Sequence, residues 1–371
     1  MRSVLASDSI NRINIGCVWC FATLCILMAA APFAAFAFPI FDAISLQLRS
    51  PYRDNVLQGI NNSGHVIGYS IGDGGLSTTA VWDTSGNIQF KAGNEGVSIN
   101  DSGAIVGIAR APDGRAGGFF QVADGTLEYL GGLVPGRYDS RPMQLNNSNI
   151  VIGVDAPSFK AFIWDQSGAM KDLGIPAMSG AYGINNLGQV VGQNNLGIPF
   201  VWDPVNGLSD IELPASAYNG FALDINDVGQ VVGKYQTNAG FSLFLWDAAN
   251  GIRTIGNPGG ISPVAIHVNN FGQVAGVDGL GAFYWEEGLG RLDLMDLIVD
   301  NLNIELLTTA GINDAGQIAI NGNDGRFEGD GFLLTPRNVG SVPEPSTMTL
   351  LIIGVVLLFS KKFRREMSVS K

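Results

Sequence analysis

One short phrase occurs seven times along this chain of 371 residues, and the repetition constrains the fold more than any other feature. The phrase is Ile-Asn-Asn/Asp-x-Gly-x-Val-x-Gly, with small variations. Its copies span Ile60–Gly68, Ile99–Gly107, Leu145–Gly153, Ile184–Gly192, Ile225–Gly233, Val268–Gly276 and, with an altered end, Ile312–Ile320. The first Asn residues of successive copies are 39 to 46 residues apart. Such a period is typical of repeat folds, in which each unit buries an apolar face against its neighbours.

The polar part of the phrase predicts a tight turn between two strands. In the first copy, Asn61-Asn62-Ser63-Gly64 fits a type I turn followed by a left-handed residue, a common hairpin connection. Asn suits the first position because its side chain bonds the turn backbone, and Gly suits the last because it lacks Cβ. The third copy carries Asn149 in place of this Gly, and Asn tolerates positive φ well. The phrase therefore indicates hairpin chemistry and not a ligand-binding loop.

Each copy continues with a variable loop, an uninterrupted apolar run, a polar turn and a final short strand. The apolar runs are Ala80–Trp82, Gly118–Phe120, Ala161–Trp164, Phe200–Trp202, Leu243–Trp246, Ala282–Trp285 and Gly331–Leu334. Because they do not alternate with polar residues, we expect these strands to be buried on both faces. An Asp follows several of the runs, as in Trp82-Asp83, and is best explained as a turn residue.

Four antiparallel strands per unit, buried on both faces, are typical of a propeller blade. A β-helix is the alternative, but its parallel rungs require no tight hairpin turns. We therefore predict an all-β fold, a seven-bladed β-propeller of four-stranded antiparallel blades. The seventh unit lacks its own fourth strand, whereas a strand-like segment at Ala43–Leu48 precedes the first unit. We predict that this N-terminal strand pairs with Gly331–Leu334 and closes the ring.

Charge and cysteine content narrow the possible functions. Residues 38–341 contain 14 Lys and Arg against 30 Asp and Glu, a net charge of −16. Such a domain should repel nucleic acid and should not attract an anionic polymer through its overall field. All three cysteines, Cys17, Cys20 and Cys25, lie in the N-terminal apolar segment. If that segment is removed, the domain offers no disulfide, thiol nucleophile or Cys-ligated zinc.

The N-terminal segment has the composition of a targeting sequence. Residues 1–37 combine a polar start that contains Arg2 and Arg12, an apolar stretch, and the small-x-small sequence Ala35-Phe36-Ala37. This order predicts a secretory signal peptide and export through the Sec machinery. An uncleaved membrane anchor is the alternative, because the apolar stretch is long for a signal. In either case the segment is expected to form a hydrophobic helix that precedes an exported domain.

The C-terminal residues 341–371 combine Pro343-Glu344-Pro345, an apolar run from Met348 to Ser360, and a basic cluster. The positive-inside rule keeps the cluster in the cytoplasm and leaves residues 38–340 outside. The order and spacing resemble the PEP-CTERM sorting signal of Gram-negative bacteria, although six residues follow the basic cluster. This resemblance implies processing by an exosortase at Pro-Glu-Pro. A short hydrophobic membrane anchor of the ordinary kind is the alternative.

The repeats are similar to those of the HAF family of extracellular proteins, named for a His-Ala-Phe signature in the third strand. Ala-Phe occurs at Ala161-Phe162 and Ala282-Phe283, and no copy keeps the His. The turn phrase at Ile184–Gly192 matches the family well, and the resemblance covers most of residues 55–335. It implies an exported repeat protein and specifies no activity. The Trp-Asp dipeptides also resemble WD-repeat propellers, but the Gly-His of that pattern is missing.

Strand alternation places the connections of the blades on two faces. The first-to-second and third-to-fourth turns are tight and share one face, whereas the variable loops share the other. Binding residues concentrate on variable loops of rigid scaffolds, where Arg and Tyr can stack on and hydrogen-bond a sugar or a protein. The alternative is that these loops are polar only because they are exposed. The candidate ligand-binding residues are Arg110, Arg115, Arg137, Tyr138, Arg141, Tyr218 and Tyr235.

Signals for catalysis or metal binding are weak. His65 and His267 are explained as variation within the repeat, and no Gly-x-Ser-x-Gly, His-Glu-x-x-His or phosphate-loop motif occurs. One variable segment is rich in oxygen ligands for calcium, although its spacing does not fit an EF-hand and an ordinary polar loop is the alternative. The candidate calcium ligands are Asn321, Asn323, Asp324, Glu328 and Asp330. No other cofactor is expected.

These observations predict an exported, non-enzymatic repeat protein, anchored in the membrane before processing and afterwards at the surface of a Gram-negative cell or outside it. We expect it to bind extracellular polysaccharide or another surface protein in the biofilm matrix. A propeller enzyme that acts on glycans, as a hydrolase or a lyase, is one alternative. A purely structural surface protein is another.

Overall fold

The computed structural model describes residues 38–46, 52–168, 170–176, 178–259, 262–299, 305–323 and 330–337. The proposed signal peptide, the sorting tail with Pro343-Glu344-Pro345 and the two flanking hydrophobic helices lie outside these residues. Phe38–Arg337 form one compact unit. Among the described residues, no helix has the length and apolar character needed to cross a membrane.

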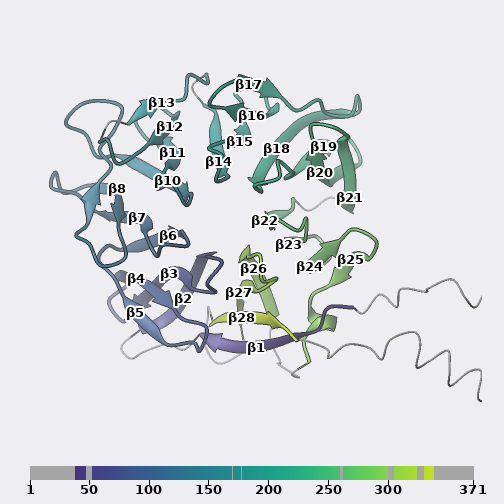
Figure 1. Cartoon of the computed structure of the whole chain (residues 1–371), viewed down its shortest axis with the longest axis horizontal. Coiled ribbons are helices and arrows are strands. Elements are labelled where there is room, and N and C mark those ends of the chain that lie inside the picture. The colour runs from purple at the N-terminus through teal and green to yellow at the C-terminus, as the bar shows by residue number, and fades with distance from the viewer. Residues whose placement is uncertain are drawn as a thin grey trace, which may run out of the picture. The chain divides into compact units, whose positions relative to one another are not determined.

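Seven four-stranded antiparallel sheets form the blades of a propeller, and six of them each consist of four consecutive strands (Figure 1). Blade 1 consists of β2 (Tyr52–Ile60), β3 (Val66–Gly72), β4 (Ser77–Trp82) and β5 (Ile88–Phe90). Blade 2 consists of β6 (Glu95–Ile99), β7 (Ile105–Arg110), β8 (Ala116–Gln121) and β9 (Glu128–Tyr129). Blade 3 consists of β10 (Ser140–Leu145), β11 (Val151–Asp155), β12 (Lys160–Trp164) and β13 (Lys171–Asp172).

The remaining blades follow the same order. Blade 4 consists of β14 (Gly180–Ile184), β15 (Val190–Gln193), β16 (Pro199–Asp203) and β17 (Gly207–Asp210). Blade 5 consists of β18 (Ala217–Ile225), β19 (Val231–Thr237), β20 (Gly240–Asp247) and β21 (Gly251–Gly259). Blade 6 consists of β22 (Val264–Val268), β23 (Val274–Asp278), β24 (Gly281–Glu286) and β25 (Gly290–Asp293), and the 3₁₀ helix η1 (Met295–Leu297) follows it.

Blade 7 combines both ends of the domain and confirms the predicted ring closure. It consists of β26 (Glu305–Ile312), β27 (Ile318–Asn323), β28 (Asp330–Pro336) and, as its outer strand, β1 (Phe41–Leu46). β1 pairs antiparallel with β28, with Ala43 opposite Leu334 and Leu46 opposite Gly331. The described strand begins at Phe41, two residues before the segment that the sequence indicates. The outer strand of the last blade therefore comes from the start of the domain.

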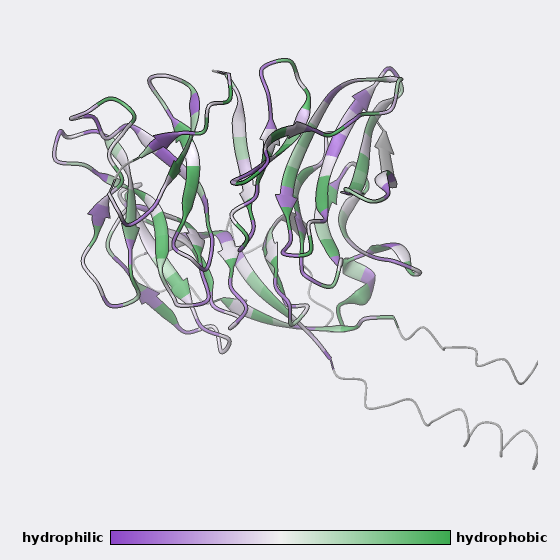
Figure 2. Cartoon of the chain, turned by 45° about the horizontal axis from the view of Figure 1, so that its top comes forward, coloured by the Kyte–Doolittle hydropathy of each residue, from purple (hydrophilic) through white to green (hydrophobic). Residues whose placement is uncertain are grey.

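The core lies between neighbouring blades, as expected from the uninterrupted apolar runs. Trp82 and Trp164, at the ends of two third strands, are almost fully buried. Phe41 of β1 joins a buried cluster with Tyr284 of blade 6 and Phe332 of blade 7. Hydrophobic residues are accordingly concentrated along the strands of the blades (Figure 2). This packing makes the blades a rigid support for their connecting turns and loops.

The turns have the predicted backbone geometry. Gly64 and its equivalents adopt positive φ, and Asn149 does the same with φ of 59°. In the first turn, the N–H of Gly64 donates to the carbonyl of Asn61 at 3.0 Å, and the N–H of Asn61 donates to the carbonyl of His65 at 3.0 Å. The sequence therefore predicted the hairpin connections correctly, including the copy that replaces Gly by Asn.

Candidate functional sites

The first Asn of every turn joins its blade to the next. In blade 1, Asn61 Oδ1 accepts hydrogen bonds from the backbone N–H groups of Ser63 and His65, as expected for a turn residue. Asn61 Nδ2 also donates to the carbonyl oxygen of Asn100 in blade 2, at 3.0 Å. This donation repeats around the propeller until Asn313 Nδ2 reaches the carbonyl of Asn61. The buried residues of this inner ring are Asn61, Asn100, Asn146, Asn185, Asn226, Asn269 and Asn313.

The second residue of every turn forms an outer ring. Its backbone N–H donates to Oδ1 of the equivalent residue in the next blade, from Asn62 to Asp101 at 2.8 Å and finally from Asp314 to Asn62 at 2.9 Å. Where Asn precedes Asp, as at Asn186 and Asp227, Asn Nδ2 also donates to the second carboxylate oxygen. The outer ring consists of Asn62, Asp101, Asn147, Asn186, Asp227, Asn270 and Asp314. The sequence interpretation of the phrase missed both of these contacts between blades.

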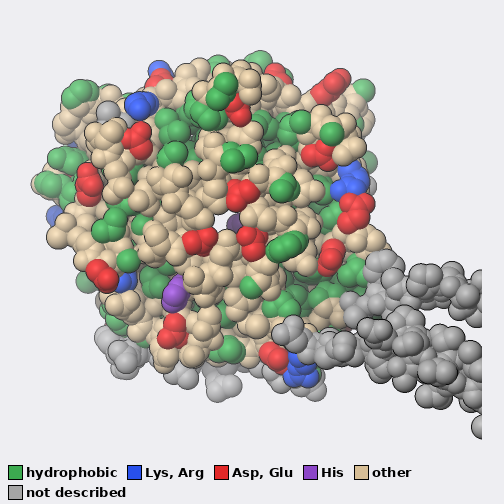
Figure 3. All heavy atoms as spheres, in the orientation of Figure 1, with side chains coloured by type: hydrophobic (Ala, Val, Ile, Leu, Met, Phe, Trp, Pro, Cys, Tyr) green, Lys and Arg blue, Asp and Glu red, His purple; other side chains and the backbone are tan. Residues whose placement is uncertain are grey.

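The rings surround a central channel with a volume of about 240 Å³ (Figure 3). Its wall includes residues from the inner strand of every blade, such as Gln58, Met143 and Tyr182. Register shifts in these strands mark β-bulges, for example between Leu57 and Gly59. No Lys or Arg is found among the described residues that line the channel.

His267 lies in this channel and belongs to the structural framework of the blades. Its Nδ1 is 3.8 Å from Asp224 Oδ2 in the neighbouring blade. Asp224 accepts the backbone N–H groups of Ile225 and Val268, so its carboxylate connects blades 5 and 6. Burial raises the pKa of Asp224 and lowers the pKa of His267. The carboxylate of Asp224 therefore joins the two blades, and His267 lies beside it in the channel.

The Asp that follows several apolar runs is indeed a turn residue. Asp83 Oδ1 accepts the backbone N–H groups of Ser85 and Asn87, and Asp203 Oδ1 accepts that of Val205. Hydrogen bonds from the side chain and backbone of Asn87 lower the pKa of Asp83. These carboxylates are acceptors within their own turns, as predicted.

On the opposite face, the structure brings four of the predicted ligand-binding arginines together. We call this face, which carries the second-to-third and blade-to-blade loops, the loop face. Arg115, Arg137 and Arg141 line a hollow of about 340 Å³ between blades 2 and 3. Arg110 and Arg115 line a hollow of about 490 Å³ between blades 1 and 2, together with Glu95. Since Arg115 and Ala116 border both hollows, the four arginines form one site, which we call the arginine cluster.

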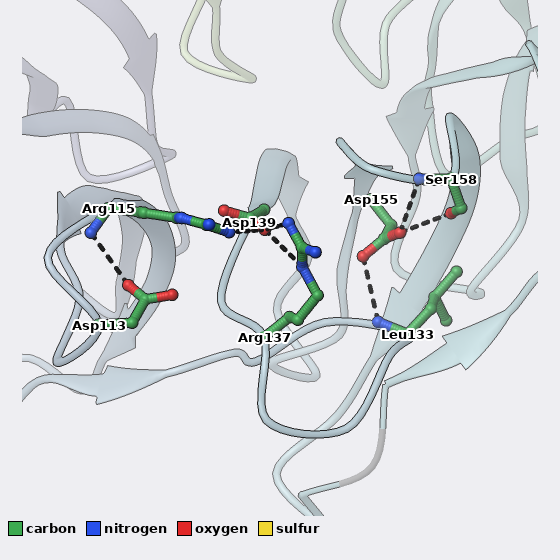
Figure 4. A network of polar contacts seen from close by, with 7 residues as sticks. All are labelled: Asp113, Arg115, Leu133, Arg137, Asp139, Asp155 and Ser158. Carbon is green, nitrogen blue, oxygen red and sulfur yellow. Dashed lines mark hydrogen bonds and ion pairs between the residues drawn. The ribbon is translucent and has the colours of Figure 1, made fainter.

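Only part of the arginine cluster is neutralised. Arg137 donates to Asp139 Oδ2 through Nε at 2.8 Å and through Nη2 at 2.5 Å, and Arg115 Nη1 lies 3.4 Å from the same oxygen (Figure 4). Hydrogen bonds from Arg137 lower the pKa of Asp139, which keeps this carboxylate ionised. Arg110 and Arg141 are exposed, and neither pairs with a carboxylate within the described part of the chain. Their guanidinium groups are therefore available to a ligand.

Contacts that do not use the guanidinium groups hold these loops in place. The buried Asp155 accepts the backbone N–H of Leu133 at 3.1 Å and bonds both the N–H and the hydroxyl of Ser158 (Figure 4). Tyr129 donates its hydroxyl proton to the carbonyl of Arg110 at 2.6 Å. The ring of Tyr129 packs edge-on against Tyr138, with centroids 5.7 Å apart. The loops are therefore organised before any ligand arrives.

Two of the predicted tyrosines lie apart from the arginine cluster. Tyr218 is the second residue of the inner strand of blade 5 and is 58% exposed, but blade 4 separates it from the cluster. Tyr235 is only 7% exposed and packs in a core cluster, with its hydroxyl 3.0 Å from Thr254 Oγ1. Its placement in a loop was wrong, because the hairpin of β19 and β20 continues pairing as far as Thr237 and Gly240. Tyr138 is half-buried beside Tyr129.

The candidate calcium segment falls only partly within the described residues. Asp324 and Glu328 lie outside them, whereas Asn323 ends β27 and Asp330 begins β28. Asn321 bonds the backbone of Leu57 in blade 1 through both Oδ1 and Nδ2, and Nδ2 also donates to Thr308. Its side chain is thus engaged in joining blades 7 and 1. Among the described residues, no group of three or more His, Cys, Asp or Glu side chains is placed to hold a metal.

Comparison with known proteins shows the fold alone. No family model matches the chain, and no curated protein matches its sequence. A catalytically inactive variant of virginiamycin B lyase from Staphylococcus aureus, solved with quinupristin, is similar with a TM-score of 0.56 and 11% identity. The similarity covers 80% of this chain and 100% of the lyase.

Two further solved structures share the propeller. YCF48 bound to D1 peptide has a TM-score of 0.51 and 14% identity, over 83% of this chain and 99% of that one. The extracellular domain of a one-component system from B. thetaiotaomicron has a TM-score of 0.52 and 18% identity, over 81% of this chain and 40% of that one. Because an enzyme, a peptide complex and an extracellular domain share the fold, the function must be argued from the site.

Proposed function

We propose that this protein is an exported, non-enzymatic propeller that binds acidic extracellular polysaccharide through the arginine cluster. The observation that carries the proposal is the convergence of four arginines on two adjoining hollows in a domain whose net charge is −16. The overall negative charge of the domain repels anions. A local cluster of arginines on such a domain is therefore best explained as a binding site for an anionic ligand. Arg binds carboxylate groups through two parallel hydrogen bonds, which a polymer of uronic acids supplies repeatedly along its length.

The arrangement of charges favours a polymer that bridges both hollows. Arg110 lines one hollow, Arg141 lines the other, and Arg115, which pairs with Asp139, borders both. Two half-buried aromatic rings adjoin the cluster, because Tyr129 bonds the carbonyl of Arg110 and packs against Tyr138, the residue after Arg137. An aromatic ring beside cationic groups suits a ligand that combines apolar sugar faces with carboxylates. Extracellular placement is supported by the signal-like N-terminus and by an extracellular domain with the same fold.

The test uses polygalacturonate as the probe and its fully methyl-esterified form as the neutral control. Binding of the full-length protein would be measured at increasing salt, and the polymer would be sized afterwards. We expect saturable binding to the acidic form only, weakened by salt. Replacing both Arg110 and Arg141 by Ala should reduce affinity about tenfold or more, because each loses a charge-assisted contact.

A matched pair of substitutions separates the site from total charge. Lys171→Ala with Arg253→Ala removes the same two positive charges outside the hollows and should leave affinity within about twofold. Equal losses in the two double variants would contradict the proposal, as would the absence of binding by the unaltered protein. Shortened polymer would instead support the alternative, an enzyme that acts on glycans.

A further inference from the structure

The opposite face carries an unexpected row of exposed apolar side chains. We call it the turn face, because it consists of the first-to-second and third-to-fourth turns. The residue after the outer-ring position is Ser in blades 1 to 3, namely Ser63, Ser102 and Ser148. In blades 4 to 6 it is Leu187, Val228 and Phe271, which are 63%, 66% and 73% exposed. These three residues, together with Val205 at 88% exposure in an outer turn of blade 4, form what we call the apolar arc.

Packing and turn geometry do not explain the apolar arc. The backbone N–H groups of Ser63, Leu187 and Phe271 make the same hydrogen bond, each to the Oδ1 of the inner-ring Asn two residues earlier. The turn therefore forms equally well with a Ser or with a large apolar residue. Apolar residues exposed on three successive blades lower the solubility of a protein. Exposed apolar patches of this kind therefore mark interaction surfaces.

The surroundings of the apolar arc are acidic. Leu187, Val228 and Phe271 each adjoin the outer ring, whose three carboxylates are Asp101, Asp227 and Asp314. The outer turns of the same blades add Asp203, Asp247 and Glu286, whereas Glu287 is already paired with Arg253. No Lys or Arg occurs within the turns of blades 4 to 6, and Figure 3 shows hydrophobic and acidic side chains together around the central opening. A partner must therefore supply apolar side chains and positive charge at once.

We propose that the turn face binds a cationic, apolar polypeptide segment of another protein. The apolar side chains of that segment contact the arc, and a Lys or Arg lies over the channel mouth near Asp227 and Asp314. Asp314 Oδ2 accepts one hydrogen bond from the ring, from Asn270, whereas Asp227 Oδ2 accepts two, so Asp314 has the greater spare capacity for a cation. An acidic polysaccharide is repelled here, so this face and the arginine cluster serve different ligands.

The experiment uses a displayed library of random twelve-residue peptides as the probe, selected against the full-length protein in a mild non-ionic detergent. We expect enriched peptides to combine Lys or Arg with Leu, Ile or Phe, and to bind more weakly as salt rises. If the selection enriched mainly peptides that lack either the basic or the apolar residues, the proposal would be overturned. Failure to enrich any sequence would also overturn it.

Matched variants locate the binding surface. Changing Leu187, Val228 and Phe271 together to Ser restores the residue that blades 1 to 3 carry, so the fold should be preserved. This triple variant should bind the selected peptides about tenfold more weakly or worse, because the apolar contacts are lost. Asp314→Asn introduces a residue that the outer ring already uses, and should weaken binding severalfold and reduce its salt dependence.

Two controls keep the result specific. The Arg110→Ala, Arg141→Ala variant alters only the loop face and should bind the peptides as the unaltered protein does. Peptide binding that the triple Ser variant retains in full would overturn the proposal. Capture of phosphatidylcholine vesicles by the unaltered protein, lost in the triple Ser variant, would likewise overturn it in favour of a lipid surface. Polygalacturonate binding should not change in the triple Ser variant, so the two proposals succeed or fail separately.

Discussion

At the scale of single residues, the two adjacent polar positions of each turn have different requirements. The first needs an acceptor for the turn backbone and a donor for the next blade, and Asn supplies them on two separate atoms, Oδ1 and Nδ2, whereas Asp supplies acceptors only. All seven copies carry Asn there. The second position needs only an acceptor, and it is Asn in four copies and Asp in three. Hydrogen bonding between blades thus explains a sequence difference that turn geometry leaves open.

The same chemical change at two adjacent residues tests this explanation. Asn146→Asp removes the buried Nδ2 donor to the carbonyl of Asn185 and introduces a buried charge, so the free energy of unfolding should fall by roughly 3 kcal/mol or more. Asn147→Asp keeps the Oδ1 acceptor for the N–H of Asp101, but it loses the exposed bond from Nδ2 to Asp101 Oδ2 and brings two carboxylates together. It should therefore cost about 1 to 2 kcal/mol, less than Asn146→Asp. Urea unfolding of both variants provides the measurement. Equal losses of stability would show that the inner ring has no special role.

At the scale of strands and turns, the sequence predicts what depends on neighbours along the chain. The hairpins, the positive φ of Asn149 and the buried third strands all follow from local pattern, and the structure confirms them. Contacts between blades are not encoded in this way, so the bond from Asn61 to Asn100 could not be foreseen. The burial of Tyr235 depends on how far one hairpin continues, and no residue type marks that limit.

The glycine that ends the repeated phrase gives a prediction at this scale. In blade 4, a Cβ on Gly192 would lie 1.8 Å from the carbonyl oxygen of Gly180, so the inner strand would have to move. In blade 6 there is more room at the equivalent Gly276. A Cβ there would lie 3.0 Å from the Phe283 ring and 3.2 Å from the carbonyl oxygen of Ala265. Gly192→Ala should therefore lower the free energy of unfolding by about 3 kcal/mol, and Gly276→Ala by about 1 kcal/mol. If the Gly192→Ala and Gly276→Ala proteins were equally stable, the short distance to the carbonyl oxygen of Gly180 would not be what requires glycine at position 192.

At the scale of the whole domain, the two faces of the propeller have opposite chemistry although each blade has the same design. Every turn on the turn face is short and conforms to the repeat, yet its exposed positions differ between blades and create the apolar arc. The arginines of the loop face come from separate loops and strands, Arg110 and Arg141 among them. The sequence placed these arginines on one face, but it did not show that they meet at two hollows, one between blades 1 and 2 and one between blades 2 and 3. A repeat scaffold thus separates the residues that build it from those that vary.

Ring closure by β1 gives the prediction that belongs to the complete propeller. Phe41 and Leu46 are each 1% exposed, and they pack in two different clusters, one with blade 6 and one with blade 1. A protein that begins at Gln47 should therefore lose contacts on both sides of blade 7. Compared with a protein that begins at Phe38, its free energy of unfolding should fall by about 4 kcal/mol or more, from the burial of two large apolar side chains.

The shape of the unfolding transition tells how the ring is held together. Without β1, blade 7 keeps three strands and its hydrogen bonds to blade 1 but loses its outer strand. Unfolding can then start at this weakened blade, so the urea transition should broaden as its midpoint falls. A synthetic peptide of residues 38–48 should restore both the midpoint and the slope by adding the missing strand to β28. Asp42→Asn, which removes only an exposed ion pair with Arg337, should change stability by less than about 1 kcal/mol. An unchanged transition in the shortened protein would mean that contacts between blades hold the ring without a closing strand.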